Sequence, residues 1–178
     1  ELFWEKVLAP SARGIPTLLC SRQYQRAPLP FVKSDDVRAG EIAAEWLWDR
    51  GRRRIVYWSA KHDEFNGGAL SLEQRFEGCG RALEKAGSRL KRRILNRTEA
   101  LISALNGSDR PDGIVCYSDD DAVQAVRLAR GLGLSIPGDV AVIGHDDSRI
   151  AELPEFNLTT VAPQKREVGE KALEMALR

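Results

Sequence analysis

The chain has 178 residues, 43% of them hydrophobic, so it can bury the core of one large domain or two small lobes. Its 27 basic residues nearly balance 26 acidic ones, and a net charge of +1 gives no electrostatic reason for the whole chain to bind nucleic acid. No apolar stretch approaches the roughly 20 residues of a membrane helix, so no membrane partner is expected. Three widely spaced cysteines without a CxxC pair argue against zinc ribbons and indicate a reducing, cytoplasmic location.

Short apolar runs along the chain are expected to form strands. They are continuous and do not alternate with polar residues, which is typical of strands buried on both faces of a parallel sheet. The runs cover residues 17–20, 55–58, 113–117, 140–144 and 158–161.

Helical patterns separate these runs. Strands that alternate with helices of this length predict an α/β fold, with parallel sheets flanked by helices and right-handed crossovers. Basic clusters at residues 52–54 and 91–93 precede apolar runs and are interpreted mainly as solvated loop charges. The helices are expected at residues 39–50, 71–87, 98–105, 119–130 (capped by Asp119) and from about residue 166 onward.

Polar side chains follow three of the predicted strands. Ser59 comes after the second run, Ser118 and Asp119 after the third, and Asp146 after the fourth. Ligands of open α/β sheets bind beyond the carboxyl ends of the strands, so these groups favour a polar ligand rich in hydroxyls or amides. Each also has a simpler explanation, since aspartates cap helices and form turns. The loop at residues 59–70 lies where a ligand loop would be expected.

Arg75 is a further candidate because it lies at the start of a predicted helix, after a long polar loop. The helix dipole disfavours a cation in the first turn, which is a mild cost for a purely structural arginine. A guanidinium at this position could instead donate to ligand oxygens.

Signatures of catalysis and of cofactor binding are missing from the sequence. It contains no GxSxG motif, no GxxxxGK[ST] phosphate loop and no GxGxxG motif after a strand. A metal site at His145, Asp146 and Asp147 is conceivable, but adjacent side chains point in different directions and His62 is the only other histidine. We therefore predict no catalytic residue, no metal and no cofactor.

Several segments match, in order and spacing, the motifs of one known family. Residues 34–44 correspond to V-D-N-x-x-A-G…A-A, residues 51–55 to G-H-R-x-I, residues 75–87 to R-x-x-G-F…A-L…A-G, residues 110–119 to R-P-T-A-I-x-x-x-N-D, residues 133–147 to G-L-x-V-P-x-D-V-x-V-x-G-x-D-D, and residues 158–161 to L-T-T-V. The chain therefore resembles the LacI/GalR transcription regulators over nearly its whole length.

The resemblance implies a two-lobed fold of the periplasmic-binding-protein type I. Residues 1–33 would be the remnant of an incomplete N-terminal lobe, residues 34–157 the C-terminal lobe, and residues 158–178 the crossover that returns to the first lobe. The helix-turn-helix head and the closing strands of the family have no counterpart in the sequence, so we expect the chain to be a fragment.

The resemblance also implies a function. A small-molecule effector (a sugar, nucleobase or related compound) would bind between the lobes and alter how a homodimer presents its heads to operator DNA. The chain itself would reach DNA only through the missing head. Residues 90–98 are shorter than usual and lack the aromatic that forms one wall of the family's effector pocket.

Positions matched to the family assign roles to individual residues. Arg75, Ser118 and Asp146 fall on effector contacts, and Ser118 replaces a frequent Asn. Ser21 ends the first strand at an effector position where Asp is usual. The helix that begins at Asp119 falls on the dimer surface, with Val123 and Val126 as interface residues.

Two other functions remain open. A solute-binding protein of a sugar transporter would share the fold, and the segment before Glu1 would discriminate, by being a DNA-binding head or a secretory signal. An α/β enzyme acting on a sugar or nucleotide would lose turnover when Asp146 and Arg75 are substituted. The motif series favours the sensor domain of a regulator and not an enzyme.

Overall fold

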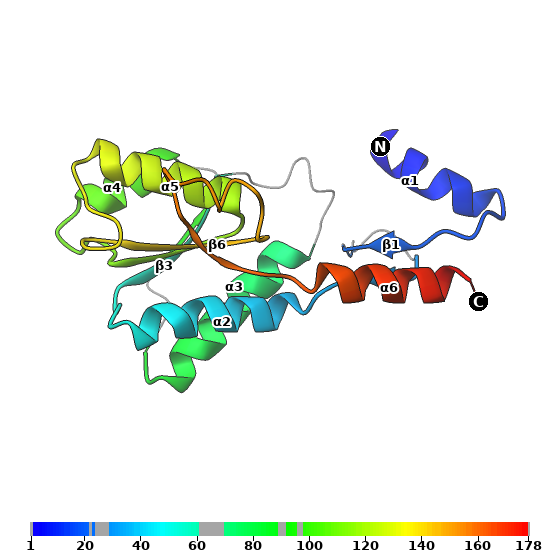
Figure 1. Ribbon diagram of the computed structural model, residues 1–178, viewed down its shortest axis with the longest axis horizontal. Helices are drawn as coiled ribbons and strands as arrows, with labels where there is room; N and C mark the ends of the chain where they lie inside the picture. The colour runs from blue at the N-terminus through cyan, green and yellow to red at the C-terminus, as the bar shows by residue number, and fades with distance from the viewer. Residues whose placement is uncertain are drawn as a thin grey trace. The chain divides into compact units, whose positions relative to one another are not determined.

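The computed structural model describes residues 2–21, 23, 29–60, 70–88, 92–95 and 98–177, and within these residues the chain divides into two compact units. The first unit contains the two ends of the chain. Its strands pair in parallel, with Leu19 opposite Phe31, and the C-terminal helix packs against both (Figure 1). Its elements are α1 (Leu2–Ala12), β1 (Leu19–Cys20), β2 (Phe31–Val32) and α6 (Lys165–Ala176).

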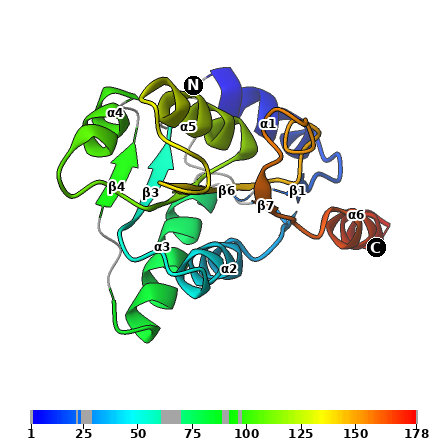
Figure 2. The ribbon, with the colours of Figure 1, turned by 60° about the vertical axis from the view of Figure 1, so that its left-hand side comes forward.

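The second unit is built on a parallel sheet with the order β4-β3-β5-β6-β7 among the described residues. Figures 1 and 2 show α2 and α3 on one face of this sheet and α4 and α5 on the other. The α/β prediction with parallel strands between helices is therefore confirmed. The elements are α2 (Asp36–Asp49), β3 (Ile55–Ser59), α3 (Ser71–Lys85, of which Ser71–Glu73 are grouped with the first unit), β4 (Arg92–Leu95), α4 (Thr98–Asn106), β5 (Gly113–Cys116), α5 (Asp119–Gly131), β6 (Ala141–His145) and β7 (Thr159–Val161).

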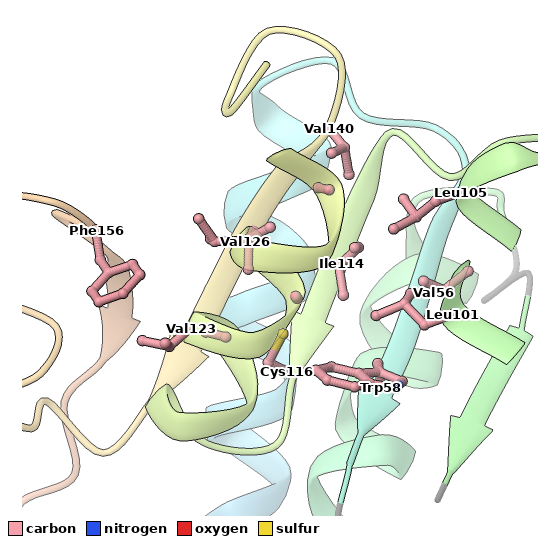
Figure 3. Close-up of a cluster of buried hydrophobic side chains, with 14 residues drawn as sticks. Val56, Trp58, Leu101, Leu105, Ile114, Cys116, Val123, Val126, Val140 and Phe156 are labelled. Atoms are coloured by element: carbon pink, nitrogen blue, oxygen red, sulfur yellow. The ribbon is translucent and has the colours of Figure 1, made fainter. Parts of the chain in front are cut away.

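The core of the second unit lies between the sheet and helices α4 and α5. Trp58 and Ile114 project from the central strands and meet Leu101 of α4 and Val126 of α5 (Figure 3). The apolar strands are buried on both faces, because α2 covers the other side of the sheet. Its Leu47 packs so close to β5 that a Cβ added to Gly113 would lie only 3.3 Å from Leu47 Cδ1. This packing fixes the carboxyl ends of the strands relative to one another.

Helices α2 and α3 cross at very short range through two glycines. A Cβ added to Gly40 would overlap the carbonyl oxygen of Arg75, and one added to Gly78 would overlap that of Val37. Only glycine permits such a backbone approach. The crossing places the start of α2, which carries Asp36, against the second turn of α3, which carries Arg75.

Three elements were not predicted from the sequence: α1, β2 and β4. The interpretation of the basic clusters as solvated loop charges is wrong in part, because Arg92 and Arg93 belong to strand β4. In the other cluster, the Arg52 guanidinium donates to the carbonyl oxygens of Pro137 at 2.6 Å and Gly138 at 3.1 Å, so it ties two loops together.

The segment expected to begin the return crossover remains in the second unit's sheet. Thr159 lies opposite Ile143 in the parallel pair of β7 with β6, and the division between the units falls after Pro163. The assignment of the three segments to lobes of a larger fold stays a prediction. None of the helices within the described residues is both long and apolar enough to span a membrane.

Candidate functional site

Polar groups gather at the carboxyl ends of β3, β5, β6 and β7 in the second unit. Parallel strands end at the same edge of a sheet, so side chains that follow these strands are neighbours. We call this group the strand-end site. It comprises Ser59, Ala60, Arg75, residues 117–119, Asp121, residues 145–148 and Thr160, with Asp36 beside Arg75.

Arg75 is fixed at two points on its guanidinium group. Its Nε donates to Asp36 Oδ1 at 2.8 Å and its Nη1 donates to the carbonyl oxygen of Tyr117 at 2.7 Å. The guanidinium carbon also lies 4.8 Å from the centre of the Tyr117 ring, within the range of a cation–π contact. With side-chain exposures of 13% for Arg75 and 6% for Asp36, this is a largely buried ion pair that orients the arginine.

Ser118 is the N-cap of helix α5, which corrects the prediction that Asp119 caps it. Ser118 has extended backbone angles, φ −142° and ψ 170°, and its hydroxyl accepts a hydrogen bond from the backbone N–H of Asp121 at 3.2 Å. Asp121 in turn accepts from the N–H of Ala60, which follows β3, at 3.2 Å. The start of α5 is therefore connected to the end of the neighbouring strand.

Asp119 is a buried hub that joins three strand ends. Only 1% of its surface is exposed, and its Oδ2 accepts hydrogen bonds at 2.8 Å from both the N–H and the hydroxyl of Ser148. Its Oδ1 accepts from the hydroxyl of Thr160 at 2.6 Å. The carboxylate thus connects the end of β5 with the loop after β6 and with β7.

Asp146 and Asp147 both have left-handed backbone angles, with φ of 115° and 47°. Such angles are uncommon outside glycine and cost about 1–3 kcal/mol each, so they persist where surrounding contacts enforce them and often mark functional sites. Here the N–H of Asp146 donates to Val161 at 3.1 Å and that of Asp147 to the Thr160 hydroxyl at 3.2 Å. The Asp146 side chain is 47% exposed, and its Oδ1 lies 2.9 Å from His145 Nδ1.

The remaining predicted site residues lie in two different places. Ser59 ends β3 within the strand-end site, where it is fully buried. Ser21 belongs to the first unit, where it has a left-handed φ of 66° and donates its N–H to Val32 at 2.7 Å. The predicted ligand loop falls mostly on residues 61–69, which lie outside the described residues.

Val123 and Val126 do not fit the predicted dimer surface. They are 3% and 0% exposed and pack in the core of the second unit, where Val123 lies near Phe156 (Figure 3). A side chain buried within one chain offers no area to a partner. Dimerisation stays a prediction, but these two side chains give it no support.

Burial shifts the pKa values of two groups on the strands that carry the site, Tyr57 and Cys116. It raises the pKa of the Tyr57 phenol and of the Cys116 thiol well above their usual values. Both groups therefore stay neutral at physiological pH. In the described part of the chain, no cluster of three or more histidine, cysteine or acidic residues could hold a metal ion.

Sequence reasoning missed Asp36 as the partner of Arg75 and Asp119 as the hub. Asp36 reads as an ordinary acidic residue in the first turn of a helix, a position favoured by the helix dipole alone. The partners of Asp119 lie 29 and 41 residues away in the chain, at Ser148 and Thr160. No local signal identifies pairs at such separations.

Comparison with known proteins finds transcription regulators among the relatives. The chain is 29% identical to the arabinose metabolism transcriptional repressor of Geobacillus stearothermophilus in an alignment of 179 positions that covers 92% of this chain and 47% of that protein. It therefore spans about half the length of the curated relatives it matches. A LacI transcriptional regulator from a Rhodococcus species superimposes with a TM-score of 0.81 at 25% identity, covering 96% of this chain and 64% of that one.

A second solved structure is described as the transcriptional regulator CelR in complex with cellobiose. It superimposes with a TM-score of 0.74 at 25% identity and covers 92% of this chain and 52% of that one. The family described as the periplasmic binding protein-like domain matches residues 44–178. These matches confirm the fold that the motif series implied. The chain belongs to the periplasmic binding protein-like domain family, in the form found in LacI/GalR-type transcription regulators.

Proposed function

We propose that this ligand-binding domain senses a small neutral molecule rich in hydroxyl groups, such as a sugar, at the strand-end site. The observation that carries the proposal is the fixed guanidinium of Arg75, held by Asp36 and by the Tyr117 carbonyl. A donor oriented before binding loses little entropy when a ligand hydroxyl arrives. The names of an arabinose repressor and a cellobiose complex among the similar proteins support a sugar.

The exposed carboxylate of Asp146 supplies a complementary acceptor. His145 Nδ1 lies 2.9 Å from one of its oxygens, which orients the carboxylate, and the left-handed backbone fixes where it projects. Sugar hydroxyls both donate and accept, so a site with one fixed guanidinium and one oriented carboxylate can engage two of them. We propose no catalytic role for these groups.

Regulation would follow from differential binding. A ligand shifts an equilibrium between two conformations only by as much as its affinities for them differ. We propose that the ligand changes the conformation of the whole regulator and thereby its affinity for operator DNA, with DNA recognition made outside these 178 residues. The supporting observation is the near-neutral charge of the chain together with relatives named as transcriptional repressors.

A thermal-shift titration with arabinose, cellobiose, other sugars, polyols and nucleobases tests the proposal. A ligand that binds only the folded state raises the melting temperature in proportion to the logarithm of its concentration. Arg75→Ala and Asp146→Ala should each weaken the responding ligand by about 10-fold or more, since a hydrogen bond to a charged group contributes roughly 1.5–3 kcal/mol.

The matched control is Arg81→Ala. Arg81 lies on the same helix as Arg75, is exposed and pairs only with the exposed Glu77 among the described residues, so its loss should leave ligand affinity unchanged. Unchanged affinity in both site variants would refute the site assignment. A panel in which no compound shifts the melting temperature would refute the ligand class.

A further inference from the structure

We infer that the Asp36–Arg75 ion pair makes the strand-end site reject anions, so that it binds neutral ligands and excludes phosphorylated and carboxylated ones. The inference rests on the proposed function, because it concerns the ligand class of the same site. It differs from that proposal in assigning selectivity to Asp36, a residue that contacts the arginine.

The geometry removes one of the arginine's usual means of binding an anion. Arginine recognises carboxylates and phosphates with two parallel N–H donors on neighbouring nitrogens. In Arg75 the Nε donor is used by Asp36 and one Nη1 donor by the Tyr117 carbonyl. The fork formed by Nε and Nη2 is therefore unavailable to an anion. The remaining N–H groups, one on Nη1 and two on Nη2, belong to a guanidinium whose charge Asp36 already compensates, so they suit a hydroxyl or carbonyl oxygen better than an anion.

The charges of the site also disfavour an anionic ligand. Asp36 compensates the positive charge of Arg75 at an Nε–Oδ1 distance of 2.8 Å, in a place where both side chains are largely buried. The other carboxylates of the site are Asp119 and Asp121, which are buried, Asp146, which is half-exposed, and Asp147, which is exposed. An entering phosphate would meet several negative groups and a guanidinium already neutralised by its neighbour. Repulsion between like charges is strong where solvent is largely excluded.

The first experiment uses inorganic phosphate and needs no knowledge of the natural ligand. The 15N-labelled chain is titrated with phosphate while the Nε–Hε signal of Arg75 is followed by NMR. For the wild type we expect no saturable change in this signal. For Asp36→Asn, whose amide oxygen can still accept from Nε, we expect a saturable change, because the guanidinium then carries an uncompensated charge.

Asp120→Asn is the matched control. It removes the same formal charge as Asp36→Asn, but from an exposed aspartate near the same strand end. It should behave as the wild type does. Saturable binding of phosphate at Arg75 of the wild type would overturn the inference. So would an equal gain in the Asp36 and Asp120 variants, since that would be an effect of net charge alone.

The second experiment separates this inference from the proposed function. Thermal shifts are compared for matched pairs of ligands: ribose with ribose 5-phosphate, glucose with glucose 6-phosphate, and glucose with gluconate. We expect the neutral member of any responding pair to bind at least 10-fold more tightly to the wild type, and Asp36→Asn to narrow that difference. An anionic member that binds equally well refutes the selectivity and leaves the sensing function standing. A panel without any response refutes the sensing function, and the phosphate titration still decides the selectivity.

Discussion

The Asp119 carboxylate accepts two hydrogen bonds at 2.8 Å from one residue, the backbone N–H and the hydroxyl of Ser148. A third bond, from Thr160, occupies its other oxygen. The three donors come from the loop after β6 and from β7, whereas Asp119 itself begins α5. This single buried carboxylate therefore fixes the carboxyl end of β5 relative to β7 and to the loop after β6 that carries Asp146.

Removing this carboxylate should destabilise the second unit strongly. Asp119→Ala leaves the buried donors of Ser148 and Thr160 without their acceptor, and we expect a loss of about 3 kcal/mol in the free energy of unfolding. Urea denaturation at pH 7 measures it. Asp120→Ala, at the next position and exposed, should cost at most about 1 kcal/mol through the helix dipole. Similar losses of unfolding free energy in the two variants would contradict the role of Asp119 as a buried hub.

The central strands were predictable because of their surroundings. Ile55, Ile114 and Ile143 are buried by helices on both faces of the sheet, and such strands must be continuously apolar. Strand β4 was missed because two of its four residues, Arg92 and Arg93, are charged, so the segment does not form a continuous apolar run. The two-residue strand β2 is too short to give a pattern.

The site was predictable at the level of position but not of pairing. The carboxyl ends of parallel strands lie at the same end of a sheet, so the topology alone predicted that Ser118 and Asp146 would be neighbours. Which residue caps α5 was ambiguous, since Ser118 is followed by three aspartates and all four can cap a helix. The ion pair of Arg75 depends on the helix crossing at Gly40 and Gly78, which no local pattern specifies.

The N-cap at Ser118 gives a second prediction. Ser118→Ala removes the acceptor for the Asp121 N–H and should cost about 1 kcal/mol of stability, whereas Ser118→Asn should lie within a few tenths because Asn caps equally well. Urea denaturation compares the variants. If Ser118 also contacts the ligand, Ser118→Asn should change the relative affinities for different sugars while stability is preserved. An alanine variant as stable as the wild type would show that the cap contributes nothing.

The crossing of α2 and α3 gives a third prediction, in which two glycines of one helix respond in opposite directions. Gly78→Ala places a methyl group against the Val37 carbonyl and should cost about 1–3 kcal/mol by overpacking. Gly80→Ala meets no atom within 4 Å and should stabilise the helix by about 0.5–1 kcal/mol. Melting temperatures of the two variants check this, and a stabilising Gly78→Ala would contradict the close crossing.

Buried thiols make the stability depend on alkaline pH. Burial raises the pKa of Cys79 and Cys116 above the usual thiol value of 9.0. Above about pH 9 the unfolded chain therefore releases these protons while the folded chain retains them. Because the unfolded state then binds fewer protons, the free energy of unfolding should fall as pH rises, by about 1.4 kcal/mol per pH unit for each thiol. Urea denaturation between pH 8 and 10 measures this slope.

The matched variants separate the thiols from other groups that titrate in this range. Cys79→Ser keeps a donor for the Gly40 carbonyl, which the thiol meets at 3.2 Å, and Cys116→Ala keeps the core apolar. The double variant should lose stability less steeply between pH 8 and 10, although its stability at pH 7 is lower. Cys20→Ser, at the exposed thiol, is the control and should retain the wild-type slope. An unchanged slope in the double variant would mean that the two thiols ionise as readily in the folded chain as in the unfolded one.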